Sequence, residues 1–387
     1  MTRRELAGLL VASAVTPAAA RAAARPGPTA SLVGPEVKQW ARAHYRGCEN
    51  AILPSFTPDF RSLDEDGIRR DVEASIRHGF FASSCTDIGL TLDESKRFSA
   101  VVADAAAGRI LCGTILQRTT FEENLELLRA AEQAGHAHAF VVYPRGEKPT
   151  SEDDVYAWLA RLAEATSLGL VLYGTPQPNT ARFHPSGMPL AAFRRAADLP
   201  NVVAMKLTQT IGMAAASELC DVFSDRLVMN CTNLDHLPVL SRAYGVSMTG
   251  QWNVEAVQSP AKPYAVEMLA AFNAGRRDDA MGLYWALAPA YRAIADLQAP
   301  LLRNGGHPWA HIKYDQWLVG GNGGLIRPPA GDYVPTLDKA GRDGIANAYR
   351  SIAITPREGP EDAFIVGDAA FERGVRPDRA APLPSYA

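Results

Sequence analysis

A lysine at the end of an apolar run is the residue in this chain whose position most directly suggests chemistry. Lys206 follows residues 202–205 (Val-Val-Ala-Met), a run typical of a strand buried on both faces. An ammonium group is costly to remove from water unless it is paired or loses its proton, and an unprotonated lysine amine attacks carbonyl carbon. The position therefore indicates Schiff-base chemistry. The alternative is a strand-end lysine whose head group returns to solvent.

Alternating apolar and helical segments predict the scaffold that would hold Lys206. Eight apolar runs indicate strands at residues 51–54, 79–82, 110–114, 139–142, 168–172, 202–205, 227–229 and 246–248. Between them, helical spacing is found at residues 63–78, 95–106, 121–134, 152–165, 191–197, 213–223 and 237–243. Near-continuous apolar strands suit a parallel sheet covered on both faces. We therefore expect an α/β protein, a (β/α)8 TIM barrel with a C-terminal helical extension.

The chain divides into four regions, namely residues 1–30, 45–258, 259–355 and 356–387. The first carries Arg3 and Arg4 before a moderately apolar stretch and several small residues, which predicts a twin-arginine export signal and a periplasmic or secreted protein. An alanine-rich disordered or helical N-terminus is the alternative. The second region is the barrel, the third is helical at residues 264–274, 278–297 and 338–352, and the fourth is expected to be an irregular tail.

Composition and charge exclude several classes of protein. The chain has 387 residues, of which 47% are hydrophobic and 21% charged, so it resembles a soluble globular protein with a large core. The net charge of -3 gives no electrostatic basis for nucleic acid or an anionic membrane as a partner. Five scattered cysteines without a CxxC pair are interpreted as mostly buried thiols. Neither a metal nor an organic cofactor is expected.

Barrel geometry would bring several side chains to one mouth. Catalytic groups of such barrels project from the carboxyl ends of the strands, so Lys206 on the sixth strand would lie beside Tyr173 on the fifth. Ser83 and Ser84 end the second strand and would present hydroxyls there. The alternatives are a packed rim tyrosine and ordinary turn serines. Cys85 is interpreted as a small buried residue rather than a nucleophile.

Five short segments carry a resemblance to one family of enzymes. They are residues 55–58 (Ser-Phe-Thr-Pro), 90–94 (Leu-Thr-Leu-Asp-Glu), 173–176 (Tyr-Gly-Thr-Pro), 203–206 (Val-Ala-Met-Lys) and 326–329 (Ile-Arg-Pro-Pro). With these segments in this order, the chain resembles the dihydrodipicolinate synthase and N-acetylneuraminate lyase family of class I, Schiff-base-forming lyases. The resemblance runs from about residue 48 to about residue 352, which is most of the chain.

The resemblance implies a role for each candidate residue. Lys206 would attack the keto carbon of a 2-oxo acid such as pyruvate or a sugar-acid derivative, and Tyr173 would shuttle protons. The family's Gly-Thr-Thr-Gly-Glu motif, which binds the substrate carboxylate, corresponds to residues 82–86 (Ala-Ser-Ser-Cys-Thr), so Ser83 and Ser84 would bind substrate. Thr208 matches a threonine of the neuraminate lyase branch and is a further candidate for substrate contact. A homo-oligomer that needs no metal or cofactor is also implied.

Two departures from the family pattern narrow the expected activity. Residues 144–146 (Pro-Arg-Gly) stand where dihydrodipicolinate-forming members have Pro-Tyr-Tyr, so their relay tyrosine is missing, and Pro178 stands where that subgroup has an arginine for substrate. Lysine biosynthesis is therefore not the expected role. Arg145 is interpreted as a solvated loop residue, with a replacement positive charge as the alternative. We expect a lyase, either an aldolase or a hydro-lyase; the alternative is a non-catalytic binding protein for 2-oxo acids or sugar acids on a degenerate barrel.

Overall fold

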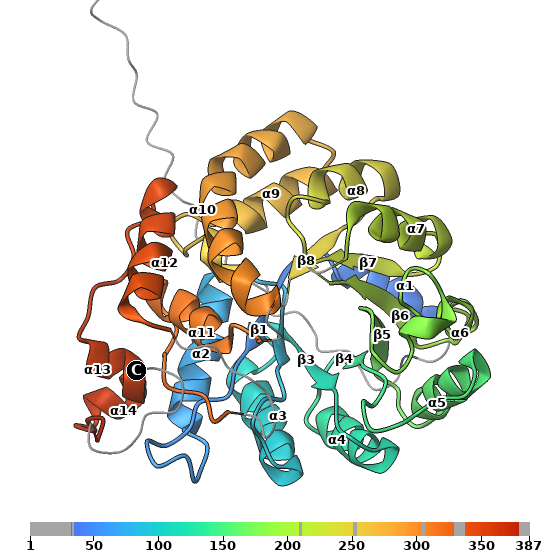
Figure 1. The fold of residues 1–387 in the computed structure, drawn as a ribbon, viewed down its shortest axis with the longest axis horizontal. Coiled ribbons are helices and arrows are strands. Elements are labelled where there is room, and N and C mark those ends of the chain that lie inside the picture. The colour runs from blue at the N-terminus through green and yellow to red at the C-terminus, as the bar shows by residue number, and fades with distance from the viewer. Residues whose placement is uncertain are drawn as a thin grey trace, which may run out of the picture.

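Eight parallel strands close into a barrel in the computed structural model of the chain, which describes residues 32, 35–208, 211–250, 254–303, 306–328 and 337–378 (Figure 1). The strands follow one another around the barrel in sequence order, and β8 pairs with β1. They are β1 (Gly47–Ile52), β2 (Ala82–Cys85), β3 (Leu111–Leu116), β4 (His138–Val141), β5 (Gly169–Gly174), β6 (Val202–Leu207), β7 (Val228–Cys231) and β8 (Met248–Gly250). The predicted TIM barrel is confirmed.

Helices between the strands surround the barrel and bury its outer face (Figure 1). They are α2 (Glu65–Arg77), α3 (Leu92–Ala106), α4 (Phe121–Gln133), α5 (Glu152–Glu164), α6 (Leu190–Ala196), α7 (Met213–Phe223) and α8 (Leu237–Tyr244), with a 3₁₀ turn η1 (Ala181–Phe183) before α6. Local sequence starts two of them: Thr91 and Glu94 form a capping box at α3, and Ser151 and Asp154 form one at α5. Each box satisfies backbone N–H groups that the first helical turn leaves unpaired.

A helix before the barrel closes its N-terminal end. This helix is α1 (Pro35–His44), and its Val37 and Ala41 belong to the same buried cluster as the residues that fill the barrel interior. Tyr45 follows the helix, is buried, and donates its hydroxyl to the carbonyl of Ala137 at 3.3 Å. Side chains therefore fill this end of the barrel, and the carboxyl ends of the strands are the end at which barrels of this kind place their functional groups.

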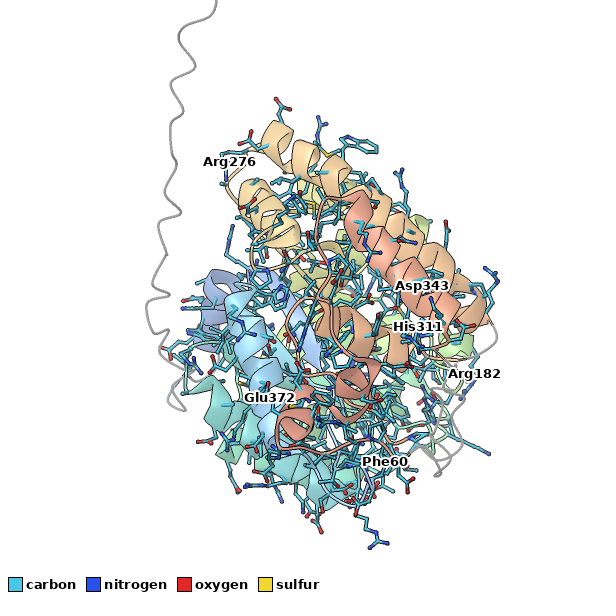
Figure 2. The ribbon with its side chains drawn as sticks, turned by 90° about the vertical axis from the view of Figure 1, so that its left-hand side faces the viewer. Phe60, Arg182, Arg276, His311, Asp343 and Glu372 are labelled. Atoms are coloured by element: carbon cyan, nitrogen blue, oxygen red, sulfur yellow. The ribbon has the colours of Figure 1, made fainter. Side chains whose placement is uncertain are left out.

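The region after β8 is helical to a greater extent than predicted. It contains η2 (Glu255–Val257), α9 (Tyr264–Asn273), α10 (Arg277–Arg303), α11 (Trp309–Leu318), α12 (Lys339–Ser351), α13 (Glu361–Val366) and α14 (Asp368–Glu372). The tail from residue 356 was expected to be largely irregular; its described part also contains two short helices, and α13 buries Phe364, Ile365 and Val366 against the core. Figure 2 shows α14 beside α2, where Arg70 donates to Glu372 at 2.8 Å.

Strand positions differ from the predictions where polar residues are buried. The predicted second strand, residues 79–82, was placed on an apolar run, but β2 begins at Ala82 and includes both serines. Likewise β1 begins at Gly47 and takes in Glu49 and Asn50, which the prediction left outside the strand. Apolar content marks burial, whereas ladder hydrogen bonds define a strand, so the polar positions inside the barrel were misassigned.

Other sequence-based expectations have separate outcomes. All five cysteines are buried free thiols, as predicted, and burial raises the pKa of the Cys85 thiol. The predicted export signal lies outside the described residues. Within the described ranges, none of the helices is long and apolar enough to cross a membrane.

Candidate active site

Lys206 and Tyr173 lie side by side at the mouth of the barrel. The ladder between β5 and β6 pairs the two residues directly, and Lys206 Nζ lies 3.5 Å from the Tyr173 hydroxyl. Lys206 is 5% exposed, and its Nζ also lies 4.8 Å from the centroid of the Tyr173 ring and 5.6 Å from that of Phe140. Two aromatic faces therefore surround the amine, and one of them carries a hydroxyl within reach of it.

Two threonines form the wall next to this pair. Thr208, two residues beyond Lys206, is buried and donates its hydroxyl to the carbonyl of Gly174 at 3.3 Å. Thr175, two residues beyond Tyr173, donates its hydroxyl to Thr208 Oγ1. The two hydroxyls thus join the ends of β5 and β6 and hold Lys206 and Tyr173 in a fixed relation.

The two candidate serines of β2 face opposite sides of the barrel wall, because successive side chains of a strand alternate. Ser84 Oγ donates to Glu49 and lies 3.2 Å from His138 Nε2, inside the barrel. Ser83 Oγ instead donates to Asn50 Oδ1 at 2.5 Å, within a network between β1 and the outer helices. The structure therefore brings the Ser84 side chain, and not that of Ser83, to the interior that Lys206 also faces.

A buried acid and imidazole fill the interior around Ser84. His138 Nε2 lies 2.7 Å from Glu49 Oε1, and both side chains are almost completely excluded from solvent. Sequence reasoning missed both residues, since one falls before the predicted first strand and the other directly before the predicted fourth. A charge-bearing residue at the edge of an apolar run was the only signal for either of them. Their pairing satisfies polar groups that would otherwise be costly to bury.

Asn230 places an amide next to the lysine. The β6–β7 ladder pairs Lys206 with Asn230, and Val228, two residues earlier on β7, belongs to the cluster inside the barrel. Asn230 is fully buried, and among the described residues neither its Oδ1 nor its Nδ2 has a hydrogen-bond partner. Because a buried amide without partners costs roughly 1–3 kcal/mol, its retention beside Lys206 favours a role in binding a ligand.

We expect Asn230→Leu to stabilise the free protein while it weakens substrate binding. Removing two unpaired buried polar atoms should raise the free energy of unfolding by about 1–2 kcal/mol, whereas loss of a hydrogen bond to a charged substrate should raise KM by roughly 10-fold or more. Urea unfolding and steady-state kinetics measure the two effects. The control is Asn233→Leu, because Asn233 Oδ1 accepts from the Tyr291 hydroxyl at 2.9 Å and its loss should destabilise. Equal destabilisation by both substitutions would assign Asn230 a structural role.

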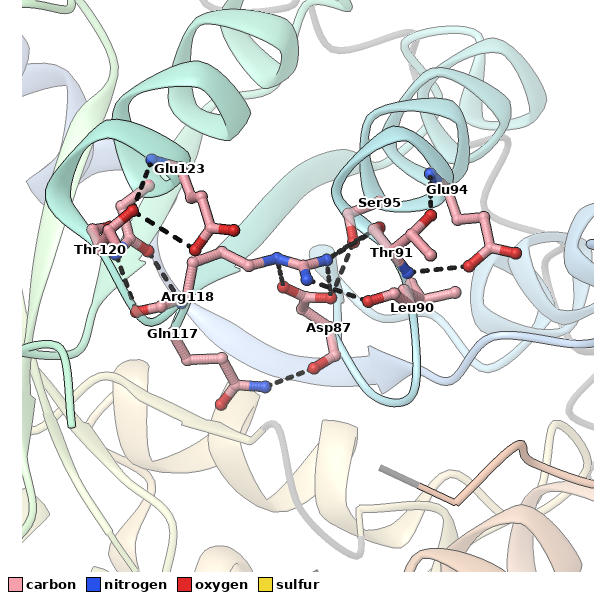
Figure 3. A network of polar contacts seen from close by, with 10 residues as sticks. Asp87, Leu90, Thr91, Glu94, Ser95, Gln117, Arg118, Thr120 and Glu123 are labelled. Atoms are coloured by element: carbon pink, nitrogen blue, oxygen red, sulfur yellow. Dashed lines mark hydrogen bonds and ion pairs between the residues drawn. The ribbon is translucent and has the colours of Figure 1, made fainter. Parts of the chain in front are cut away.

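An ion pair fixes the loop that follows β2 (Figure 3). Arg118, which follows β3, approaches Asp87 with Nε 2.6 Å from Oδ2 and NH2 2.7 Å from Oδ1, and Ser95 Oγ donates to the same carboxylate at 2.7 Å. Burial raises the pKa of Asp87 to about 6, although the charge of Arg118 opposes this shift. Arg118 also donates to the carbonyls of Leu90 and Thr91 at 2.9 Å, so one guanidinium holds the whole turn.

The C-terminal region holds the same loop from its other side. Arg327, part of the late segment on which the resemblance rests, donates to the carbonyl of Gly89 at 2.6 Å and to that of Phe60 at 3.0 Å, and it pairs with Glu94. Gly89 has a φ of +62°, and a Cβ at this position would lie 2.0 Å from the Arg327 carbonyl oxygen. Only glycine therefore permits this approach of the two segments.

A buried polar network lies behind β1, on the side away from Lys206. Asn50 Nδ2 donates to Glu255 Oε1 at 2.7 Å, and Gln316 Nε2 donates to the same oxygen at 3.2 Å. Burial, only partly opposed by these hydrogen bonds, raises the pKa of Glu255 to about 7. The network joins Ser83, through Asn50, to the C-terminal helices.

Glu255 should make stability fall as pH rises. Its pKa in the folded state exceeds the ordinary value of 4.5, so between pH 4.5 and about 7 the folded chain binds more protons than the unfolded chain. Over this window we expect the folded state to lose about 3 kcal/mol of stability through this carboxyl. Glu255→Gln keeps an acceptor oxygen without a titrating proton, so its stability relative to the parent should grow by that amount. Urea unfolding across the window tests this, and parallel pH curves for the two proteins would contradict it.

Comparisons with known proteins give consistent results. No family model matches the chain. It is 29% identical over 255 residues to 4-hydroxy-tetrahydrodipicolinate synthase of Methanothrix thermoacetophila, covering 65% of this chain and 82% of that protein. The enzyme of the same name from Symbiobacterium thermophilum is 25% identical over 306 residues, covering 77% and 94%.

Solved structures share the fold at low sequence identity. YagE, a prophage protein of the dihydrodipicolinic acid synthase family from E. coli K12 in complex with pyruvate, superposes with a TM-score of 0.63 at 20% identity over 80% of this chain and 99% of its own. Dihydrodipicolinate synthase from Aquifex aeolicus gives a TM-score of 0.63 at 16% identity over 81% of this chain and 100% of its own.

Proposed function

Because this chain belongs to the dihydrodipicolinate synthase and N-acetylneuraminate lyase family, we propose that it is a Schiff-base-forming lyase that acts on a 2-oxo acid such as pyruvate. The observation that carries the proposal is the buried Lys206 amine, 3.5 Å from the Tyr173 hydroxyl near the carboxyl ends of β5 and β6. The binding-protein alternative is not favoured, because both groups that the chemistry needs are present and adjacent.

Imine formation assigns distinct steps to the two residues. The nitrogen lone pair of Lys206 attacks the keto carbon, a C–N bond forms, and the carbonyl electron pair moves to the oxygen, which takes a proton from Tyr173. The nitrogen then loses a proton, and the hydroxyl leaves as water once it is protonated, so that a C=N bond replaces the C–O bond. The protonated imine withdraws electrons from the adjacent carbon, where a C–C bond is made or broken or water is eliminated.

Polar groups near Lys206 would hold the substrate in place. Ser84 and Thr208 present hydroxyls and Asn230 presents an amide to the interior or to the adjoining wall. In the free protein the Ser84 hydroxyl donates to Glu49. To bind a substrate carboxylate, Ser84 would have to release Glu49 and donate to the substrate instead. The Ser83 hydroxyl is bonded to Asn50 behind the wall, which leaves its backbone as the means of contact.

The reaction named for the sequence relatives is not proposed for this chain. Residues 144–146 lack the tyrosine pair of that subgroup, and the exposed Arg145 stands within it. We therefore propose that this chain shares a 2-oxo acid reactant with that subgroup. Its second reactant, or the product that it releases on cleavage, is proposed to differ from theirs. Export through Arg3 and Arg4, and assembly into a homo-oligomer, are further proposals, which cell fractionation and light scattering would test.

The first test is to trap the imine in the parent protein. Incubation with pyruvate and borohydride should reduce the imine to a stable secondary amine, visible as a mass increase of the intact chain. Peptide mapping should place the modification on Lys206. If neither pyruvate nor other 2-oxo acids give an adduct, the lyase proposal fails.

A further inference from the structure

A histidine from the C-terminal region, His307, lies between α10 and α11 and near enough to Lys206 and Arg145 for their charges to act on it. The ring of His307 stacks on that of Trp309, with centroids 3.3 Å apart and planes 16° apart. Trp309 packs against a buried cluster that includes Leu53, which directly follows β1, and Ile88, which lies just beyond β2. Figure 1 shows α10 and α11 on the side of the barrel where β1 lies.

This placement puts His307 on the side of the barrel opposite the strand that carries Lys206. Since the eight strands are arranged in sequence order, β1 and β2 lie across the barrel from β5 and β6, which carry Tyr173 and Lys206. Burial, followed by the positive charges of Lys206 and Arg145, holds the pKa of His307 well below its usual range. The ring is therefore neutral at pH 7 and has one nitrogen that can accept a proton.

We propose that His307 is a second proton-transfer group of this active site, acting on the substrate from the side opposite Tyr173. The proposal rests on the imine chemistry proposed above. In the protonated imine of pyruvate, a ring nitrogen of His307 takes a proton from C3. The C–H electron pair becomes the C2–C3 double bond, and the C=N electron pair moves to the Lys206 nitrogen. The products are a neutral enamine and an imidazolium, which returns its proton to carbon or to water.

Charge balance favours this step at this position. Burial is the main reason that the pKa of His307 is lowered, and the positive charges of Lys206 and Arg145 add to it. During proton transfer, the imine nitrogen loses its positive charge as the imidazole gains one. The total charge of the pair stays constant, so the transfer adds no repulsion between the imidazolium and the Lys206 nitrogen.

Exchange of the C3 hydrogens of pyruvate in D2O, followed by proton NMR, measures this step without a second substrate. His307→Gln should slow exchange by about 100-fold, within the usual range for loss of a general base. The borohydride-trapped adduct should still form, which also shows that the variant folds and positions Lys206. In His307→Ala, added imidazole should restore part of the lost rate, a rescue that a purely structural histidine would not show.

The matched control is His311, in the first turn of α11. It is buried, and a Cβ built at Gly341 of α12 would lie 3.8 Å from its Nε2. His311→Gln should leave exchange within about threefold of the parent, since it removes no proton acceptor from the site. Parent-like exchange in His307→Gln, with the adduct still trapped, would overturn the proposal. Failure of the parent to form any adduct would instead overturn the lyase function itself.

Discussion

Lys206→Ala should remove the trapped pyruvate adduct and lower turnover of the 2-oxo acid by at least about 10⁴-fold, because no other group can then form the imine. Lys206→Arg should be equally inactive, since a guanidinium keeps the positive charge without a nucleophilic amine. Because Lys206 is only 5% exposed, circular dichroism should confirm that both variants fold before their activities are compared. Intact mass, adduct mapping and turnover are the measurements.

Lys313 provides an internal control for this result, because it is the other lysine found in the buried set. Its Nζ donates to Asp71 at 2.8 Å, to Ser55 Oγ at 2.9 Å and to the Leu53 carbonyl at 3.3 Å. These acceptors occupy the nitrogen, and the site lies behind β1, so we expect Lys313 to remain unmodified. An adduct on Lys313, or one that persists in Lys206→Ala, would contradict the assignment.

Tyr173→Phe should slow turnover by roughly 10²- to 10³-fold while the imine still forms, only more slowly. The phenyl ring preserves the aromatic face 4.8 Å from Lys206 Nζ, so the substitution removes the hydroxyl and little else. Water can transfer the same protons less efficiently, which is why activity should not vanish. Adding borohydride at successive times after mixing measures both the rate at which the imine forms and the amount that has formed at the end.

Tyr143→Phe is the matched control for Tyr173. Both rings line one pocket beside β5, but the Tyr143 hydroxyl donates to Glu147 at 3.4 Å and its ring packs on Trp158. Loss of this hydroxyl should change turnover by less than about threefold. Equal losses in the two variants would mean that packing near β5, rather than proton transfer by Tyr173, controls the rate.

Features that depend on neighbouring residues in the chain could be predicted from sequence, whereas features that depend on contacts between distant segments could not. The alternation of apolar strands and amphipathic helices is local, and it predicted the barrel and the order of its strands. That order alone placed Lys206 and Tyr173 on neighbouring strands. It could not distinguish Ser83 from Ser84, because a shift of the strand by one residue exchanges the side chains that face in and out.

Polar residues inside the barrel were hidden from sequence reasoning for a related reason. Glu49, His138 and Asn230 interrupt or flank apolar runs, where a polar residue usually marks the end of a strand. In the structure they are paired with one another or stand beside Lys206, which became evident only once the strands were in register. Their burial depends on partners from other strands, and no local pattern encodes those partners.

The pattern of apolar and helical segments predicted the barrel, the strand-end positions of Lys206 and Tyr173, and the chemistry that a buried amine beside a phenol can perform. The packed chain was needed to show which serine faces the interior, that Asn230 stands next to the lysine, and that His307 approaches from the opposite wall. His307 lies about a hundred residues from Lys206 along the chain, and its neighbour Trp309 packs on Leu53 and Ile88, which follow β1 and β2. Periodicity reports which face of an element is buried, whereas contacts between distant segments arise only when the whole chain packs.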